Sequence, residues 1–200
     1  MIGVVDYEAG NIASVCNALD AIHAKYSVSS DAAELAQCEG IILPGVGAAP
    51  GAMQSLRRRG LLSFLQSVEK PLLGICLGMQ ILFDSSEEGN TPCLGVLPGS
   101  IKKLSKSAEK IPHMGWNTVK FAVRHPLIEG IDPDAYFYFA HSFVVGLHDA
   151  TIGTTECGEE FTAVLAYRNF LGVQFHPEKS GSNGLTILKN FETQCRLYRP

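Results

Sequence analysis

The most informative segment of the chain is Leu72-Leu73-Gly74-Ile75-Cys76-Leu77-Gly78-Met79-Gln80. An apolar run, as expected of a strand buried on both faces, passes through Gly-x-Cys-x-Gly directly into a helical segment. This pattern predicts a strand–turn–helix elbow with Cys76 at its tip, because the flanking glycines allow close approach and the turn strains the central residue. We expect the Cys76 thiol at the carboxyl end of a sheet and at a helix N-terminus, which favours thiolate. An inert buried cysteine is the alternative.

Around this elbow, short apolar runs alternate with helical patterns through the first half of the chain, which predicts βαβ units. Between residues 92 and 147 the pattern changes to short alternating strands, which we expect to extend the same sheet as an antiparallel appendage. The predicted fold is a three-layer α/β sandwich, a mostly parallel sheet flanked by helices, in one domain over residues 1–200. Strands are expected at 2–5, 25–28, 40–43, 72–75 and twice within 161–175, and helices at 12–19, 53–68, 77–83 and 185–195.

The composition excludes several classes of protein. The 200 residues carry a net charge of −4, with 46% hydrophobic and 18% charged residues, which argues against disorder and against a nucleic-acid or anionic-membrane surface. Arg57, Arg58 and Arg59 are interpreted as a solvated helix face rather than a phosphate clamp. Six cysteines without C-x-x-C spacing argue against a disulfide scaffold or zinc knuckle. With no signal peptide and no apolar run long enough for a bilayer, we expect a soluble, reduced, cytoplasmic protein.

A thiol nucleophile needs a base, and His176 is the candidate. It ends an apolar strand, and Glu178 lies two residues later, where extended backbone points both side chains the same way, about 7 Å apart. Pro177 restricts the backbone, so Glu178 can orient the imidazole and stabilise its cation. A capping histidine beside a solvated glutamate has the same pattern, but the cysteine elbow favours a triad. A metal site of Cys76, His141 and His176 lacks supporting spacing.

A thiolate that attacks a carbonyl group also needs oxyanion donors. The N–H of Leu77, the residue after the nucleophile, is one. A second is expected in the segment Pro44-Gly45-Val46-Gly47, because it follows a predicted strand at the sheet edge where ligand loops of open α/β sheets gather. An ordinary strand-to-helix turn has the same composition.

In Gly74–Gln80 and Phe175–Glu178 the chain resembles the triad-type (class I) glutamine amidotransferases. Within that class it resembles the family of glutaminase subunits of imidazole glycerol phosphate synthases. The resemblance runs from about residue 2 to residue 191, with one departure at Phe143, where tyrosine is expected. The segments that carry it are Tyr7-Glu8-Ala9-Gly10-Asn11, Pro44-Gly45-Val46-Gly47, Pro112-His113-Met114-Gly115-Trp116-Asn117 and His176-Pro177-Glu178-Lys179-Ser180.

This resemblance implies that glutamine is hydrolysed to glutamate and ammonia, with Cys76 as nucleophile, His176 as general acid/base and Glu178 as its orienter. It also implies a heterodimer with a (β/α)8-barrel synthase, which uses the ammonia to make imidazole glycerol phosphate and an aminoimidazole carboxamide ribonucleotide in histidine biosynthesis. We expect no metal and no organic cofactor. The other implied residues are oxyanion donors Gly47 and Leu77 and glutamine-pocket residues Gly45, Val46, Gln80, Ser142 and Phe143. Met114, Trp116 and Asn117 are expected at the partner interface, because an apolar and a large aromatic side chain stand there between turn residues; a tryptophan in a satellite core is the alternative.

Alternative functions remain open. A glutaminase for another synthase, such as one that makes anthranilate or pyridoxal phosphate, has the same elbow, although the segment 112–117 argues against it. A γ-glutamyl hydrolase or cysteine peptidase acts without a partner. A non-catalytic scaffold is disfavoured by the intact Cys76, His176 and Glu178. The length supports a partner, because 200 residues leave no room for a synthase domain beside one α/β core.

Overall fold

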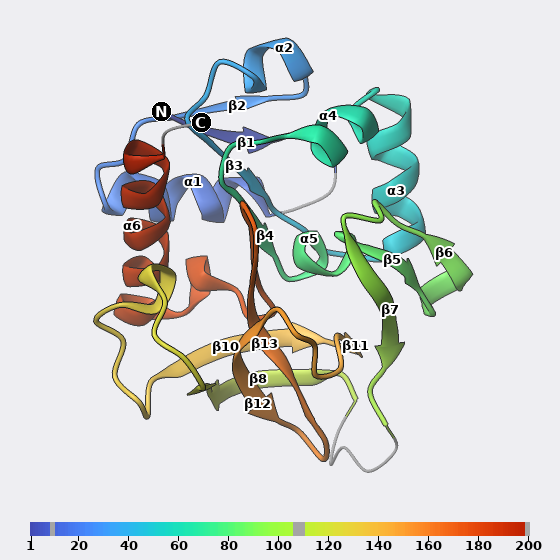
Figure 1. Ribbon diagram of the computed structural model, residues 1–200, viewed down its shortest axis with the longest axis vertical. Coiled ribbons are helices and arrows are strands. Elements are labelled where there is room, and N and C mark those ends of the chain that lie inside the picture. Colours follow the sequence, from blue (N-terminus) through green and yellow to red (C-terminus); the bar gives the residue numbers. More distant parts are fainter. Residues whose placement is uncertain (9–10, 106–110, 199–200) are drawn as a thin grey trace.

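An eight-stranded sheet forms the centre of the computed structural model, which describes residues 1–8, 11–105 and 111–198 (Figure 1). The strands pair in parallel from the first to the fifth in spatial order, and the last three continue the sheet in antiparallel pairing. In spatial order they are β2 (Tyr26–Ser29), β1 (Ile2–Val5), β3 (Gly40–Leu43), β4 (Leu72–Ile75), β14 (Phe170–Val173), β13 (Glu160–Tyr167), β12 (Thr151–Glu156) and β9 (Lys120–Phe121). The predicted strands of the parallel half are confirmed, with 25–28 displaced by one residue.

Helices cover both faces of this sheet, which is why every residue of β1, β3, β4 and β14 is buried. The helices are α1 (Ile12–Ala21), α2 (Ala32–Leu35), α3 (Ala49–Arg58), α4 (Leu62–Ser67), α5 (Leu77–Gln80) and α6 (Gly181–Leu197), with 3₁₀ turns η1 (Glu88–Asn90), η2 (Pro126–Ile128) and η3 (Pro177–Lys179). In Figure 1, α1 and α6 lie to the left of the sheet and α3 and α4 to the right, each pair within its own apolar cluster. The predicted three-layer sandwich is confirmed. Across the three described stretches, no helix has the length and apolar character needed to cross a membrane.

The predicted helix over 53–68 is wrong as a single helix. The chain leaves α3 at Gly60, whose φ of +68° is in the left-handed region that glycine adopts without a Cβ penalty. Two hydrogen bonds close this end, Gly60 N–H to Arg57 O at 3.1 Å and Leu61 N–H to Leu56 O at 3.0 Å, the pattern of a Schellman cap. The helical periodicity continues across the break, so periodicity alone could not locate it.

The predicted helix over 77–83 is also too long. It ends at Gln80, and Phe83 begins β5 (Phe83–Ser86), which pairs in parallel with β7 (Leu97–Lys103). Short apolar runs are compatible with either element, and the partner strand decides between them.

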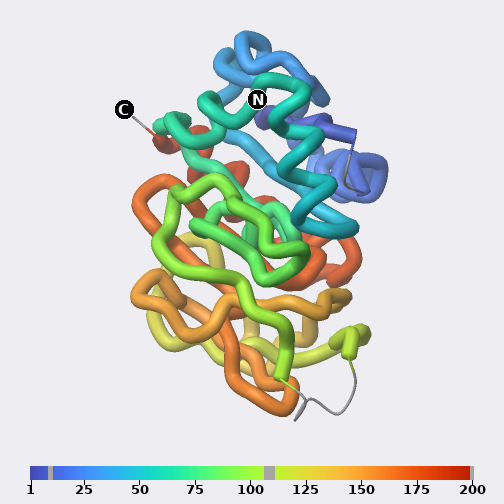
Figure 2. The backbone as a smooth tube through the Cα atoms, turned by 90° about the vertical axis from the view of Figure 1, so that its right-hand side faces the viewer, coloured from blue at the N-terminus to red at the C-terminus, as the bar shows by residue number. Residues whose placement is uncertain are grey.

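The region between 92 and 147 departs most from expectation, because little of it extends the main sheet. β8 (His113–Thr118) and β10 (Tyr136–His141) form a separate antiparallel ribbon, and β11 (Phe143–Val144), β7, β5 and β6 (Thr91–Pro92) form a third sheet. The antiparallel extension of the main sheet is instead β13, β12 and β9. Figure 2 shows this yellow-to-orange half gathered at one end of the molecule, below the blue-to-teal half. An alternating pattern predicts a strand with one buried face, but it does not specify which sheet the strand joins.

Candidate active site

The elbow has the predicted geometry. Cys76 lies between β4 and α5 with φ 53° and ψ −110°, a strained conformation for a residue with a side chain. A Cβ on Gly74 would lie 2.6 Å from Met79 N, and a Cβ on Gly78 would overlap Leu43 O. The close packing of β4, α5 and β3 therefore requires both glycines, and it positions the Cys76 thiol at the carboxyl end of the central strands.

His176 and Glu178 lie at the carboxyl end of β14, the strand next to β4. His176 Nδ1 and Glu178 Oε1 are 2.8 Å apart, and the two side chains are only 3% and 1% exposed. The backbone N–H of His176 donates to the backbone oxygen of Tyr138 at 2.8 Å, and the Ser180 hydroxyl donates to the backbone oxygen of His176 at 2.6 Å. The backbone at His176 is therefore held by Tyr138 of the ribbon strand β10 and by Ser180, the residue that caps α6.

Electrostatics favour a charged imidazole at this position. Burial by itself lowers the pKa of His176, but its interactions with Cys76 and Glu178 outweigh burial and raise that pKa to about 10. An imidazolium held between a thiol group and a carboxylate can stabilise a thiolate and can donate a proton to a leaving group.

The Pro44–Gly47 segment lies directly against the elbow. A Cβ on Gly45 would lie 2.7 Å from Leu77 Cβ and would overlap the Gly78 backbone nitrogen. Gly47 has a φ of +92°, and a Cβ there would meet nothing within 4 Å. Leu77 begins α5, so its N–H is among those without an intrahelical partner. The two segments predicted to supply oxyanion donors are therefore in contact.

Tyr7 anchors this segment from the end of β1. Its hydroxyl donates to Pro44 O at 2.7 Å, and its ring is fully buried. Burial, and then the negative charge of Cys76, raise the pKa of Tyr7, so the phenol stays a neutral donor. Ala9 and Gly10 of the same motif lie outside the described residues.

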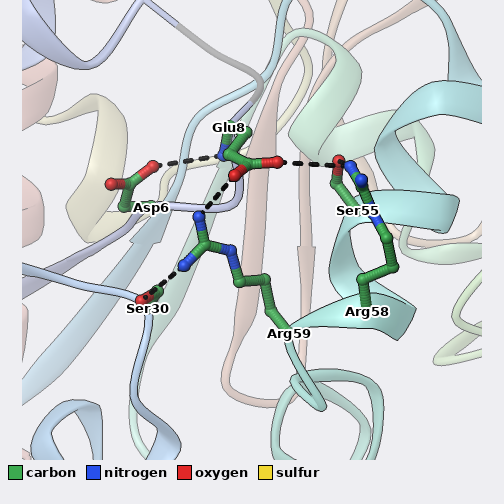
Figure 3. Close-up of polar contacts among 6 residues, drawn as sticks. All are labelled: Asp6, Glu8, Ser30, Ser55, Arg58 and Arg59. Carbon is green, nitrogen blue, oxygen red and sulfur yellow. Dashed lines mark hydrogen bonds and ion pairs between the residues drawn. The ribbon is translucent and has the colours of Figure 1, made fainter.

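Two of the three arginines interpreted as a solvated face are ion-paired. Figure 3 shows the Glu8 carboxylate between Arg59, at 2.7 Å, and Arg58, at 3.2 Å. Arg59 also donates to Ser30 Oγ at 3.1 Å, and Arg58 donates to Ser55 Oγ at 3.0 Å. Because α3 directly follows the Pro44–Gly47 segment, these contacts tie the turn after β1 to the helix that begins beside the candidate oxyanion loop.

The predicted glutamine-pocket residues fall into two groups. Gly45 and Val46 lie on the oxyanion side, where Val46 is 38% exposed. Ser142 and Phe143 are half-buried and follow the ribbon strand β10. Gln80 is buried, and its Nε2 donates to Phe143 O at 2.7 Å. Gln80 therefore anchors the Ser142–Phe143 segment through a buried side chain.

The predicted interface residues differ in exposure. Met114 and Trp116 are 63% and 56% exposed, so Trp116 is not a satellite core residue, and its ring meets the Tyr138 ring edge-on at 6.1 Å. Asn117 instead donates from Nδ2 to Glu156 O at 2.9 Å and lies 3.2 Å from His113 Nε2.

Three buried polar side chains near the site make contacts that the sequence did not predict: Gln174, His113 and His141. Gln174 Nε2 lies 3.6 Å from Cys76 Sγ, and His113 Nδ1 lies 3.0 Å from His141 Nε2. The available signal for Gln174 was a polar residue inside the apolar run Gly172-Val173-Gln174-Phe175. No comparable signal pairs His113 with His141, because their contact comes from strand pairing.

Metal chemistry has no support from the site. No group of three or more histidine, cysteine, aspartate or glutamate side chains that could hold a metal ion occurs among residues 1–8, 11–105 and 111–198. The expected absence of a metal cofactor stays a prediction.

Comparisons with known proteins show the family and the fold of this chain. Residues 3–195 match the family described as glutamine amidotransferase class-I. Among solved structures, a glutamine amidotransferase has a TM-score of 0.76 at 17% identity, covering 98% of this chain and 99% of the other. PurLQS from Thermotoga maritima has a TM-score of 0.69 at 22% identity, covering 96% of this chain and 97% of the other. At these identities the structures support the fold alone.

Curated relatives are more similar in sequence, and three of them are named "Imidazole glycerol phosphate synthase subunit HisH". The protein from Bacillus cereus is 47% identical, covering 96% of this chain and 94% of its own. Those from Dehalococcoides mccartyi and Mannheimia succiniciproducens are 46% and 43% identical, covering 96% and 94% of this chain and 96% and 97% of their own. The chain therefore belongs to the glutamine amidotransferase class-I family and, within it, to the family of these HisH subunits.

Proposed function

We propose that this chain is the glutaminase subunit of an imidazole glycerol phosphate synthase and hydrolyses glutamine to glutamate and ammonia. The observation that carries the proposal is the convergence of the strained Cys76 elbow and the buried His176–Glu178 pair at the carboxyl ends of adjacent strands. Membership of the HisH family supports the assignment to histidine biosynthesis. Cys16, Cys38, Cys76, Cys93 and Cys195 are free thiols, which fits a reducing compartment such as the cytoplasm.

In the proposed reaction, His176 takes the thiol proton, and the Cys76 thiolate attacks the side-chain carboxamide carbon of glutamine. The N–H groups of Leu77 and Gly47 stabilise the oxyanion of the tetrahedral intermediate. His176 then protonates the departing nitrogen, ammonia leaves, and a thioester remains on Cys76. Water attacks the thioester with His176 as base, which releases glutamate and restores the thiol.

Glu178 supports both half-reactions without accepting the proton itself. Its contact with Nδ1 presents the other ring nitrogen to the sulfur and stabilises the imidazolium that forms twice in each cycle. Glu178 Oε2 is buried without a hydrogen-bond partner in the described part of the chain, so the imidazolium is the contact that offsets the buried charge.

We propose that the exposed face of the β8–β10 ribbon docks a (β/α)8-barrel synthase subunit. The relatives are named as subunits, and Met114, Trp116 and Tyr136 expose large apolar side chains on this ribbon. Such aromatic anchors are typical of interface hot spots. A docked acceptor is also chemically useful, because ammonia released into neutral water becomes ammonium and loses its nucleophilic lone pair.

The test is glutamine hydrolysis by the purified chain, measured alone and with the barrel subunit and its nucleotide ligand. We expect slow hydrolysis alone, fast hydrolysis in the liganded complex, and none with Cys76→Ala, which should still support synthesis from added ammonia. Full activity without a partner would instead identify a stand-alone hydrolase, and glutamine turnover by Cys76→Ala would refute the nucleophile assignment.

A further inference from the structure

Gln174 is a fully buried amide beside the nucleophile, and the proposed reaction does not use it. It follows β14 and precedes His176 by two residues, and its side chain is 0% exposed. Its backbone N–H donates to Ala163 O at 2.8 Å. Its side chain lies between two groups, with Oε1 3.0 Å from Gln80 Nε2 and Nε2 3.6 Å from Cys76 Sγ.

The direction of this amide follows from the hydrogen-bond chain behind it. Phe143 O can only accept, so the group of Gln80 that faces it at 2.7 Å must be the NH₂. The second hydrogen of that NH₂ points to Gln174 and requires an acceptor, which is Oε1. Gln174 therefore presents its own NH₂ to the Cys76 sulfur, and the reversed amide would set two NH₂ groups against each other.

Phe143 O is held from a second side by a chain that starts on the ribbon. Asn117 Nδ2 donates to Glu156 O at 2.9 Å, so the same NH₂ faces His113 Nε2, which must accept at 3.2 Å. His113 Nδ1–H then donates to His141 Nε2 at 3.0 Å, and His141 Nδ1–H donates to Phe143 O at 3.1 Å. Burial, and next the neighbouring His113, lower the pKa of His141 to about 3, which keeps this ring neutral. The chain ends on two backbone carbonyl groups, Glu156 O and Phe143 O, which can only accept. Both ends therefore require the same direction for each hydrogen bond between them.

We propose that Gln174 is a positioning residue that donates an N–H to the Cys76 sulfur and so holds and stabilises the reactive thiolate. The proposal rests on the proposed function only in taking Cys76 as the nucleophile. A hydrogen bond to a charged acceptor is stronger than one to a neutral acceptor, so the contact favours thiolate over thiol. It also limits rotation of the sulfur, which lies 4.0 Å from Ala140 O.

The test is the pH dependence of Cys76 alkylation by iodoacetamide, followed by peptide mass mapping so that the other cysteines do not contribute. Gln174→Met keeps the length of the side chain and removes the donor. We expect the pH of half-maximal rate to rise by about one unit, with a roughly tenfold slower reaction at neutral pH and an unchanged plateau at high pH. Gln174→Glu should shift the midpoint further, because it places a carboxylate beside the sulfur. The titratable side chains that interact with Cys76, Tyr7 and His176, are the same in every variant.

Thr162→Val is the matched control. Thr162 is equally buried, and its hydroxyl lies 2.8 Å from Gly146 O and 2.7 Å from Thr151 Oγ1. The variant therefore loses hydrogen bonds away from Cys76 and should keep the wild-type midpoint. If Gln174→Met fails to fold, Gln80→Met leaves the Gln174 amide in place without its anchor and should shift the midpoint in the same direction by less. A folded Gln174→Met with the wild-type midpoint, or an unshifted Gln80→Met, overturns the proposal. Failure of the proposed function is a separate result, in which wild-type Cys76 shows no preferential alkylation and no glutamine turnover.

Discussion

The elbow between β4 and α5 and the ribbon of β8 and β10 meet at one site, but their structures depend on different parts of the chain. The elbow is nine consecutive residues whose conformation follows from two glycines and a strained cysteine. The ribbon joins strands that are far apart in sequence, with a buried histidine pair on one face and exposed Met114 and Trp116 on the other. The nucleophile is therefore held by local structure, whereas its support and its docking surface depend on long-range pairing.

The pKa values of the buried histidines in the two regions are shifted in opposite directions. The pKa of His176, beside the elbow, is raised to about 10 although burial lowers it, because Cys76 and Glu178 favour the cation. The pKa of His141, on the ribbon, is lowered to about 3 by burial and by His113. One histidine is therefore suited to hold a proton, and the other to remain a neutral link in a hydrogen-bond chain.

The largest expected effects concern the proposed triad. His176→Ala should reduce glutamine hydrolysis by about 10⁶ and Glu178→Ala by about 10⁴, because His176 transfers the protons whereas Glu178 orients and stabilises it. The double variant should be no worse than His176→Ala, since the residues act as a unit. Steady-state rates at saturating glutamine, with folding checked by circular dichroism, measure the order. An inverted order would contradict the assigned roles.

Gly47→Val tests whether the oxyanion loop links the two regions. The φ of +92° at Gly47 is unfavourable for a β-branched residue, although open space surrounds its Cβ position, so the strain is in the backbone alone. We expect partner-stimulated hydrolysis to fall by about a hundredfold or more, the size of one misplaced oxyanion donor. Complex formation and Cys76 alkylation should stay nearly unchanged. The readout is the ratio of rates with and without the partner's ligand, and a wild-type ratio would exclude this role.

Gly78→Ala tests the local nature of the elbow. Its added methyl would overlap Leu43 O, so β3 and α5 must separate, and we expect a loss of about 3 kcal/mol in the free energy of unfolding. The matched control is Gly51→Ala in α3, where a Cβ would meet nothing within 4 Å and alanine should stabilise by about 0.5–1 kcal/mol. Urea denaturation measures both changes. Equal stabilities would show that the elbow does not need its glycine.

Trp116→Ala tests the exposed face of the ribbon. The side chain is 56% exposed, so its removal should leave the fold and the isolated activity intact and weaken binding of the barrel subunit by about 30-fold. Leu197→Ala, which removes a 72% exposed side chain at the end of α6, should not change affinity. Calorimetric titration with the partner measures both. Equal losses in the two variants would place the docking surface elsewhere.

The last expected effect concerns the buried face of the ribbon. Because the pKa of His141 is lowered on folding, the unfolded chain binds more protons between pH 6.5 and about 3. The stability that neutral His141 contributes is therefore complete above pH 6.5 and is lost as pH falls, by at most about 1.4 kcal/mol per pH unit. His141→Gln should reduce the acid slope of the free energy of unfolding, whereas His23→Gln, at an exposed histidine, should keep it. Urea titrations between pH 7 and 4.5 measure the slopes, and an unchanged slope in His141→Gln would contradict this account.

The parts of this protein whose conformation is local could be predicted from the sequence. Continuous apolar runs predicted most of the parallel strands, and Gly-x-Cys-x-Gly predicted the elbow, because only glycine permits such close approach of backbone. The spacing of His176 and Glu178 predicted their contact, since a proline between them restricts the chain. These signals are short-range, so neighbouring residues suffice to establish them.

The other features depend on contacts between segments that are distant in the sequence. The break at Gly60, the end of α5 at Gln80, and the separation of the ribbon from the main sheet depend on which distant segment supplies the hydrogen bonds. The same is true of the orientation of Gln174 and of the pairing of His113 with His141, where each donor direction follows from a carbonyl on another element. A sequence pattern specifies which face of an element is buried, but the partner that buries it is a property of the folded chain.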